Sequence, residues 1–207
     1  DQVVSTGPGE RRAVALADGT VLHLDGSTRL ELHRRDGRRA RLVEGRVLAE
    51  VVHDAGRPFV LSVGDDVVTD LGTIFDVTRL EGGLRVAVAE GLVRVEVDEH
   101  AATLGAGESL TARGGRVSRQ AVATADIDGW RRGRLAYRDA ALAVVAADLS
   151  RALGRKVEVA PGIADRRFTR RLAVGDDDGD LPAPVELLFG VRIEESRGAW
   201  RPTPRQP

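Results

Sequence analysis

Apolar and polar residues alternate along most of the first half of the chain. The pattern is clearest in residues 71–97, where two alternating runs lie on either side of Glu90-Gly91. A period of two is typical of strands that bury one face, and a glycine between two such runs is typical of a tight turn. Residues 71–97 therefore predict half-buried strands joined by a hairpin at Glu90-Gly91.

Turn residues recur between the other alternating runs at intervals of about 8 to 12 residues. Asp18-Gly19, Asp36-Gly37 and Gly82-Gly83 are examples. Glycine supplies positive φ angles and aspartate binds its own backbone, so both residues favour turns. No helical pattern of useful length appears before residue 138. We therefore expect a mainly β N-terminal domain, built as a twisted roll or solenoid, or as a sandwich.

The pattern changes in the last third of the chain. Apolar residues recur there at helical spacing, namely Leu142, Val145, Ala146, Leu149 and Leu153. Gly154 stands where this helix would end, and Asp180 could begin a second, short helix over residues 182–189. Short alternating runs surround both segments. The predicted order is β-α-β-β-α-β, a small α+β module of the split βαβ type.

These changes divide the chain into five segments. Residues 118–128 are polar and rich in alanine and aspartate, which is typical of a linker. The expected division is a linker or loose lead-in strand over residues 1–12, a β domain over 13–117, a linker over 118–128, the C-terminal module over 129–201 and a tail over 202–207.

Composition narrows the possible function classes. The 207 residues carry a formal net charge of -1, so electrostatics give no case for a nucleic-acid partner. The lack of cysteine excludes disulfides and thiolate chemistry, and it fits a periplasmic protein. No apolar run of about 18 residues is present. The sequence contains no methionine and begins at Asp1, so we expect a fragment or a processed chain.

No motif for catalysis, for a metal or for a cofactor emerges from the sequence. The acidic run over residues 176–180 fails the calcium-loop pattern, because Leu181 and Leu187 stand where glycine and glutamate are required. Phosphate-binding loops and serine-nucleophile motifs do not occur. None of the four histidines has the spacing of a helical zinc pair, as their positions show: His23, His33, His53 and His100. We therefore expect no catalytic residue, no cofactor and no metal.

Two segments of the β domain resemble a known family. Residues 71–77 read LGTIFDV, and the run from Val86 to Val95 alternates around Glu90-Gly91. Together they resemble the signature of the FecR family, the envelope-spanning anti-sigma regulators of bacterial cell-surface signalling.

The C-terminal part carries a second resemblance. The run from Trp130 to Tyr137 is similar to the opening of the FecR family's C-terminal module, and residues 149–169 are similar to the next part of that module. This module resembles the small domain at the N-termini of secretins and TonB-dependent receptors. The sequence departs from the pattern at Pro182 and Pro184, which shorten the second predicted helix.

The resemblance implies where the chain acts and what it contacts. It implies the extracytoplasmic sensor region of a transmembrane anti-sigma regulator, located in the periplasm and anchored to the inner membrane by a helix upstream of Asp1. It also implies two protein partners. One is a sigma factor, held by a cytoplasmic region absent from this sequence. The other is the signalling domain of a TonB-dependent outer-membrane transducer.

A basic cluster in the C-terminal module is the candidate partner-binding site. Arginines around an edge strand discourage self-pairing and attract acidic partners. The candidate residues are Arg167, Phe168, Arg170, Arg171 and, nearer the C-terminal end, Trp200. Trp130 has a different expected role, which is to pack the module against the β domain.

Two other function classes stay open on the sequence alone. A carbohydrate- or peptidoglycan-binding envelope module would need exposed aromatic platforms, and the chain has only seven Phe, Trp and Tyr residues. An enzyme on a β roll is disfavoured because the sequence contains no recognisable catalytic motif.

Overall fold

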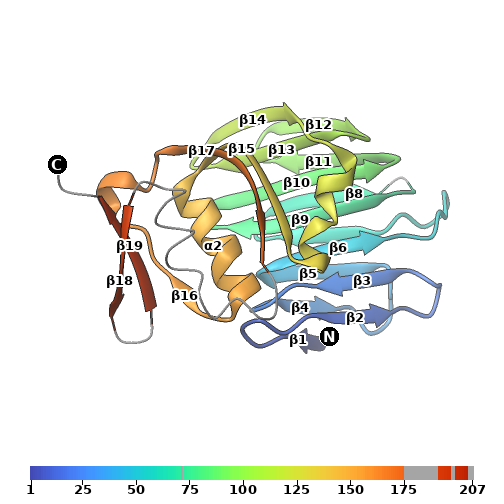
Figure 1. Ribbon diagram of the computed structural model, residues 1–207. Helices are drawn as coiled ribbons and strands as arrows, with labels where there is room; N and C mark the ends of the chain where they lie inside the picture. The colour runs from blue at the N-terminus through green and yellow to red at the C-terminus, as the bar shows by residue number, and fades with distance from the viewer. Residues whose placement is uncertain (71, 175–190, 197–198, 205–207) are drawn as a thin grey trace.

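The structure is a computed structural model that describes residues 1–70, 72–174, 191–196 and 199–204. Figure 1 shows a large β domain with a smaller module beside it, and the N-terminus lies in the β domain. The mainly β fold with a small α+β module, expected from the sequence, is confirmed.

The β domain contains two seven-stranded sheets, here called sheet A and sheet B. Sheet A has the spatial order β1 (Gln2–Ser5), β4 (Arg29–Leu32), β5 (Arg39–Glu44), β7 (Val60–Val63), β8 (Asp66–Asp70), β11 (Leu92–Val97) and β12 (His100–Gly105). Sheet B has the order β14 (Arg116–Ala121), β13 (Glu108–Arg113), β10 (Gly83–Glu90), β9 (Ile74–Leu80), β6 (Arg46–Glu50), β3 (Val21–Leu24) and β2 (Arg12–Ala15).

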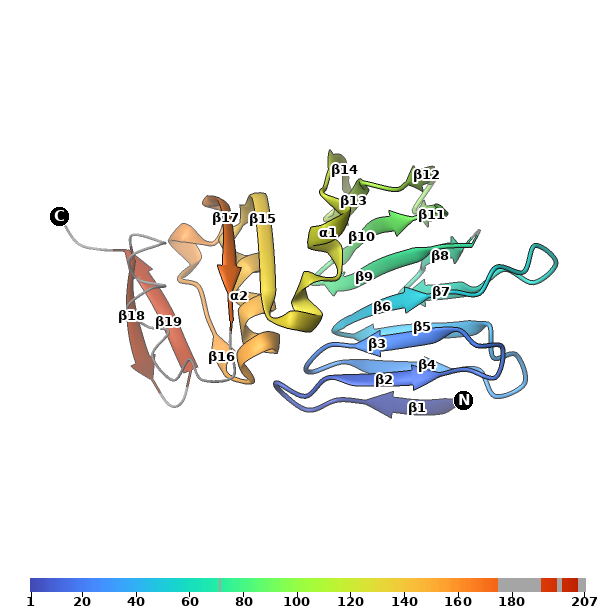
Figure 2. The ribbon, with the colours of Figure 1, turned by 45° about the vertical axis from the view of Figure 1, so that its right-hand side comes forward.

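The two sheets share one aliphatic core. Buried residues of sheet A such as Leu42 and Val95 belong to the same cluster as Phe75 and Val86 of sheet B. All strand pairs in the two sheets are antiparallel except β5 with β7, which is parallel. The chain passes repeatedly from one sheet to the other, so the domain is a two-layer roll (Figure 2).

The hairpin predicted at Glu90-Gly91 is wrong. β10 lies in sheet B and β11 lies in sheet A, so Gly91 is a corner where the chain changes sheets. Its φ is 80°, and a Cβ there would lie 2.3 Å from the carbonyl oxygen of Gly72. Gly45 makes the same crossing between β5 and β6, with φ 89°. A period of two identifies the strands but does not identify the sheet to which each belongs.

The C-terminal module has its strands in two small sheets. β15 (Arg134–Ala141) pairs with β17 (Arg167–Ala173), and β19 (Ala199–Pro204) lies between β16 (Lys156–Val157) and β18 (Val191–Ser196). Among its described residues the helices are α1 (Thr124–Ile127) and α2 (Leu142–Leu153), with short 3-10 turns η1 (Gly129–Arg132) and η2 (Pro161–Ile163). α2 ends at Gly154 in the left-handed region, as predicted. The second predicted helix, over residues 182–189, lies outside the described residues.

The predicted lead-in and linker contain regular structure. The predicted lead-in contains β1, which pairs with β4 of the β domain, and its Val4 side chain is buried. The predicted linker holds the end of β14 and the whole of α1, with Ile127 buried. The polar composition of residues 118–128 therefore reflects an exposed edge strand followed by a helical turn. The domain boundaries themselves stay a prediction.

Within the LGTIFDV segment, Thr73 and residues 75–77 are buried in the domain. The Phe75 side chain is fully buried, with 0% exposed. Gly72 has φ 102°, and a Cβ there would lie 2.3 Å from Nδ1 of His53. The Thr73 hydroxyl donates a hydrogen bond to the buried Asp70 carboxylate. Burial raises the pKa of Asp70, and the Thr73 hydrogen bond offsets part of this rise.

We expect Phe75→Ala to lower the free energy of unfolding by about 3–5 kcal/mol, because it leaves a cavity between the two sheets. Urea unfolding of the full chain measures this change. Leu92→Ala is the matched control, since Leu92 is 49% exposed and its truncation should change stability by about 0.5 kcal/mol or less. Equal losses for both variants would contradict the buried role of Phe75.

Candidate functional site

The candidate partner site lies on β17. In the described part of the chain, β17 pairs only with β15, so its other edge has no neighbouring strand. Arg167, Arg170 and Arg171 are exposed on it. The structure thus brings three of the five predicted residues together on one open edge, whose free N–H and C=O groups could pair with an added strand.

Phe168 has a different place from the one expected. Its side chain is buried, and its ring centroid lies 5.7 Å from that of Tyr137 on β15. Phe168 therefore fixes β17 on the module core and leaves the arginines to face solvent. The register shift between Tyr137 and Ala140 marks a bulge in β15 at this point, where Asp139 has φ 51°.

Two of the exposed arginines have local partners. Arg171 Nη2 lies 2.9 Å from Asp126 Oδ2 on α1, and Arg167 Nη1 donates to the Asp139 carbonyl at 3.1 Å. Exposed contacts of this kind contribute little to stability. They are therefore available for exchange with a partner's carboxylates.

Trp200 does not join the β17 cluster. It lies on β19, the central strand of the other small sheet, in register with Val157 of β16 and Glu195 of β18. The sequence placed it near an exposed tail, whereas the structure places its backbone within a sheet.

The C-terminal module is attached to the β domain through a buried polar contact. Arg46 of β6 donates to both carboxylate oxygens of Asp76 on β9, at 2.9 Å each. The indole N–H of Trp130 donates to Asp76 Oδ2 at 2.9 Å. The Arg46 guanidinium also lies 5.2 Å from the centroid of the Trp130 ring, which is a cation–π distance. The predicted packing role of Trp130 is confirmed by its 2% exposure.

A second group of charges, buried or half-buried, lies beside this contact. Asp148 of α2 pairs with Arg151 on the same helix and, at 3.4 Å, with Arg85 of β10. Burial raises the pKa of Asp148, but Arg85, Arg151 and Arg46 outweigh burial and hold its pKa below the usual value. Asp148 is therefore charged at neutral pH, and it connects the helix to the outer face of sheet B.

Asp25 completes this group with weaker pairing. Its carboxylate lies 3.7 Å from Arg11 Nε and 3.8 Å from Arg151 Nε, both beyond normal hydrogen-bond length. Burial raises the pKa of Asp25, and Arg46 and Arg151 offset only part of this effect. Burial likewise raises the pKa of Tyr137, with the Asp148 carboxylate adding to the rise.

Sequence reasoning missed these charged residues. Arg46, Asp76 and Arg85 occupy the polar positions of alternating strands, and such positions are normally exposed to solvent. The available signal was Asp76 itself, since aspartate is disfavoured inside strands. Here the C-terminal module covers that outer face, so that Arg46 and Asp76 are buried and Arg85 is half-buried.

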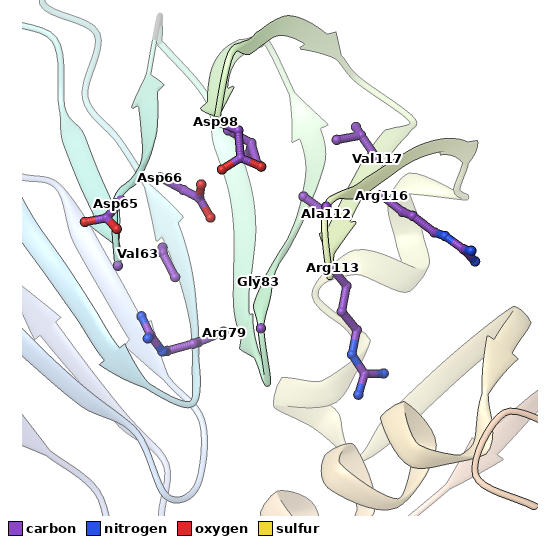
Figure 3. A pocket seen from close by; sticks show the side chains of 14 residues that line it. Val63, Asp65, Asp66, Arg79, Gly83, Asp98, Ala112, Arg113, Arg116 and Val117 are labelled. Carbon is purple, nitrogen blue, oxygen red and sulfur yellow. The ribbon is translucent and has the colours of Figure 1, made fainter.

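A shallow pocket opens at one end of the β domain (Figure 3). Its volume is about 310 Å³, and the turns at Gly64, Gly82-Gly83 and Gly115 form part of its wall. Asp66 and Asp98 lie toward one side, while the side chains of Arg113 and Arg116 extend away on the other. Burial raises the pKa of Asp66, and the nearby Asp98 raises it further.

The described residues contain no group of three or more His, Asp or Glu side chains suited to hold a metal ion. Among the same residues, no helix has the length and apolar character needed to cross a membrane.

We expect Asp76→Ala to lower the free energy of unfolding by about 3–5 kcal/mol, because it leaves the Arg46 charge buried without its partner. Trp130→Phe should cost less, about 1.5–3 kcal/mol, since it removes one hydrogen bond to a charged group and keeps the Arg46–Asp76 pair. Urea unfolding measures both values. Asp36→Ala is the control, because Asp36 pairs with Arg39 at the surface and should cost about 1 kcal/mol or less. A similar loss of unfolding free energy in Asp36→Ala and Asp76→Ala would contradict the claim that burial makes the Arg46–Asp76 pair the more important of the two.

Comparison with known proteins supports the β-domain resemblance. Residues 2–94 match the family model described as FecR protein. No curated protein matches the chain. Two crystal structures of a protein from Parabacteroides distasonis ATCC 8503, described as "a putative anti-sigma factor", have a TM-score of 0.87 and 22% identity to this chain. They cover 99% of this chain, which itself covers 100% and 99% of theirs. Residues 2–94 are therefore FecR-like, and the chain shares its fold with the Parabacteroides protein over nearly its whole length.

Proposed function

We propose that this chain is the extracytoplasmic sensor region of a FecR-like transmembrane anti-sigma regulator. In this proposal it lies in the periplasm, anchored to the inner membrane by a helix upstream of Asp1. It relays a signal by contact with the signalling domain of a TonB-dependent transducer, while a cytoplasmic region outside this chain holds the sigma factor. The FecR match over residues 2–94 and the fold shared with the Parabacteroides protein support the proposal.

The open edge of β17 is the observation that carries the partner contact. A strand with a free edge can accept an extended segment through backbone hydrogen bonds, which give affinity without a deep pocket. β17 is seven residues long and is held from behind by Phe168, so its edge is preorganised. Preorganisation lowers the entropy cost of adding a strand.

Charge gives this edge its selectivity. Arg167, Arg170 and Arg171 would repel a second copy of the same strand and attract an acidic one. The interface would be small and transient. Its total buried area would lie near about 1,200 Å², the lower limit for stable protein–protein interfaces. A regulator that must release its partner when the signal ends needs such a contact rather than a permanent one.

The glycan-binding alternative has less support. Sugar-binding surfaces need exposed aromatic rings, and the aromatic side chains that the structure describes are buried. These are Phe59, Phe75, Trp130, Tyr137 and Phe168. A protein-binding regulator that is not an enzyme fits this distribution better.

We expect Arg170→Glu to weaken binding of the purified transducer signalling domain by about tenfold at low salt, and to flatten the salt dependence of binding. The cause is loss of attraction between β17 and an acidic strand. Isothermal titration at several salt concentrations measures both effects. The melting temperature should not change, because Arg170 is exposed.

Arg41→Glu is the control for this measurement. It makes the same charge change on an exposed residue of β5, in sheet A of the β domain. Equal weakening by the two variants would indicate a general charge effect and would remove the case for β17 as the docking edge.

A further inference from the structure

The last strand of the β domain is a second open edge. β14 pairs with β13 on one side, and the described residues place no strand on its other side. All six of its residues are exposed, which holds for no other strand whose burial the structure describes. In Figure 1 it lies beside β12, the open edge of sheet A, at the end of the domain away from the N-terminus.

The register fixes which backbone groups of β14 point outward. Arg113 pairs with Arg116 across the two-residue turn Gly114-Gly115, so this is a hydrogen-bonded pair. At the other end of the two strands, the Val122 amide donates a hydrogen bond to the Gly107 carbonyl, which agrees with the same alternation of bonded and non-bonded pairs. Alternation then leaves the N–H and C=O groups of Val117, Arg119 and Ala121 directed away from β13.

The other open edges of the two sheets are less suited to pairing. β1 and β2 have four residues each. On β12 the Thr103 carbonyl already accepts a hydrogen bond from Arg119 Nη2 at 2.6 Å. The Arg119 side chain thus takes the position that a backbone N–H of an added strand would need. A residue of β14 therefore blocks strand addition at this point of β12. β14 itself has a regular six-residue register, with neither a bulge nor a proline.

From this geometry we propose that β14 is a docking edge for an extended protein segment that bears carboxylates opposite Arg116 and Arg119. Arg119 lies 3.5 Å from Glu108 and is half-exposed, so it can accept a second carboxylate. Val117, 40% exposed beside the pocket of Figure 3, fits an apolar side chain opposite it. A second copy of β14 fits poorly, because an antiparallel pair that joins the outward groups of residues 117, 119 and 121 symmetrically would set Arg119 against Arg119.

This edge is distinct from the proposed β17 contact. β14 belongs to the β domain and lies in a seven-stranded sheet, whereas β17 belongs to the C-terminal module. A partner could therefore occupy either edge independently.

The test is an NMR titration of the isotope-labelled full chain with the peptide Thr-Thr-Glu-Thr-Val-Glu, which sets glutamates opposite Arg119 and Arg116 and valine opposite Val117. The amides of Val117, Arg119 and Ala121 should shift and exchange more slowly with solvent, because they gain ladder hydrogen bonds. A control peptide with both glutamates changed to lysine should bind about tenfold more weakly or not at all.

Variants of the chain sharpen the test. Ala121→Pro removes an outward N–H that β13 does not use, so the peptide should bind about tenfold more weakly. Should Ala121→Pro lower the melting temperature, Arg119→Glu serves instead, and it should remove the preference for the acidic peptide, because either peptide would then form one attractive and one repulsive charge pair. Arg170→Glu should leave peptide binding at β14 unchanged.

Each outcome separates the two edges. Amide shifts confined to β17 would overturn the β14 proposal and would leave the proposed function standing. Loss of transducer binding in Arg170→Glu together with unchanged peptide binding at β14 would support both sites. Equal binding of the acidic and basic peptides at β14, or no shift of its amides, would overturn the charge-selective docking edge.

Discussion

The arrangement of the two parts of this chain depends on the buried contact between Arg46, Asp76 and Trp130. A guanidinium and a carboxylate lose their water when they are buried, so the pair is stable only with good geometry and satisfied hydrogen bonds. Here Arg46 bonds both oxygens of Asp76, and Trp130 adds a further donor from the C-terminal module. Separation of the module would remove the Trp130 donor and expose Leu48, which is fully buried at the interface.

This contact makes the two faces of sheet B chemically different. The inner face packs Val, Leu and Phe side chains against sheet A. The outer face carries Arg46, Asp76 and Arg85. In the module, Asp148 pairs with Arg85, and Trp130 donates a hydrogen bond to Asp76. Non-directional packing thus holds the roll together, whereas directional ionic contacts set the position of the module.

Strand edges are the surfaces that such an architecture leaves for partners. A two-layer roll that does not close must end each sheet in a strand with unpaired backbone groups. This chain places arginines on β14 of the roll and on β17 of the C-terminal module, and it uses Arg119 to cap β12. Both proposed contacts depend on the same physical condition, which is an open ladder with positive charge beside it.

The sequence by itself determined most of the strands, the helix α2 with its end at Gly154, the mainly β class and the resemblance carried by residues 71–77. These features depend on local periodicity and on the conformational freedom of glycine, both of which can be read from a short window. Only the tertiary structure decided that Gly91 is a corner between sheets, that Phe168 points inward and that residues 118–128 contain a strand and a helix. It also decided that Asp76 is buried, because a polar position on a strand is exposed or covered according to what another part of the chain places over it. Period-two alternation marks which residues share a face, and long-range packing alone determines what that face meets.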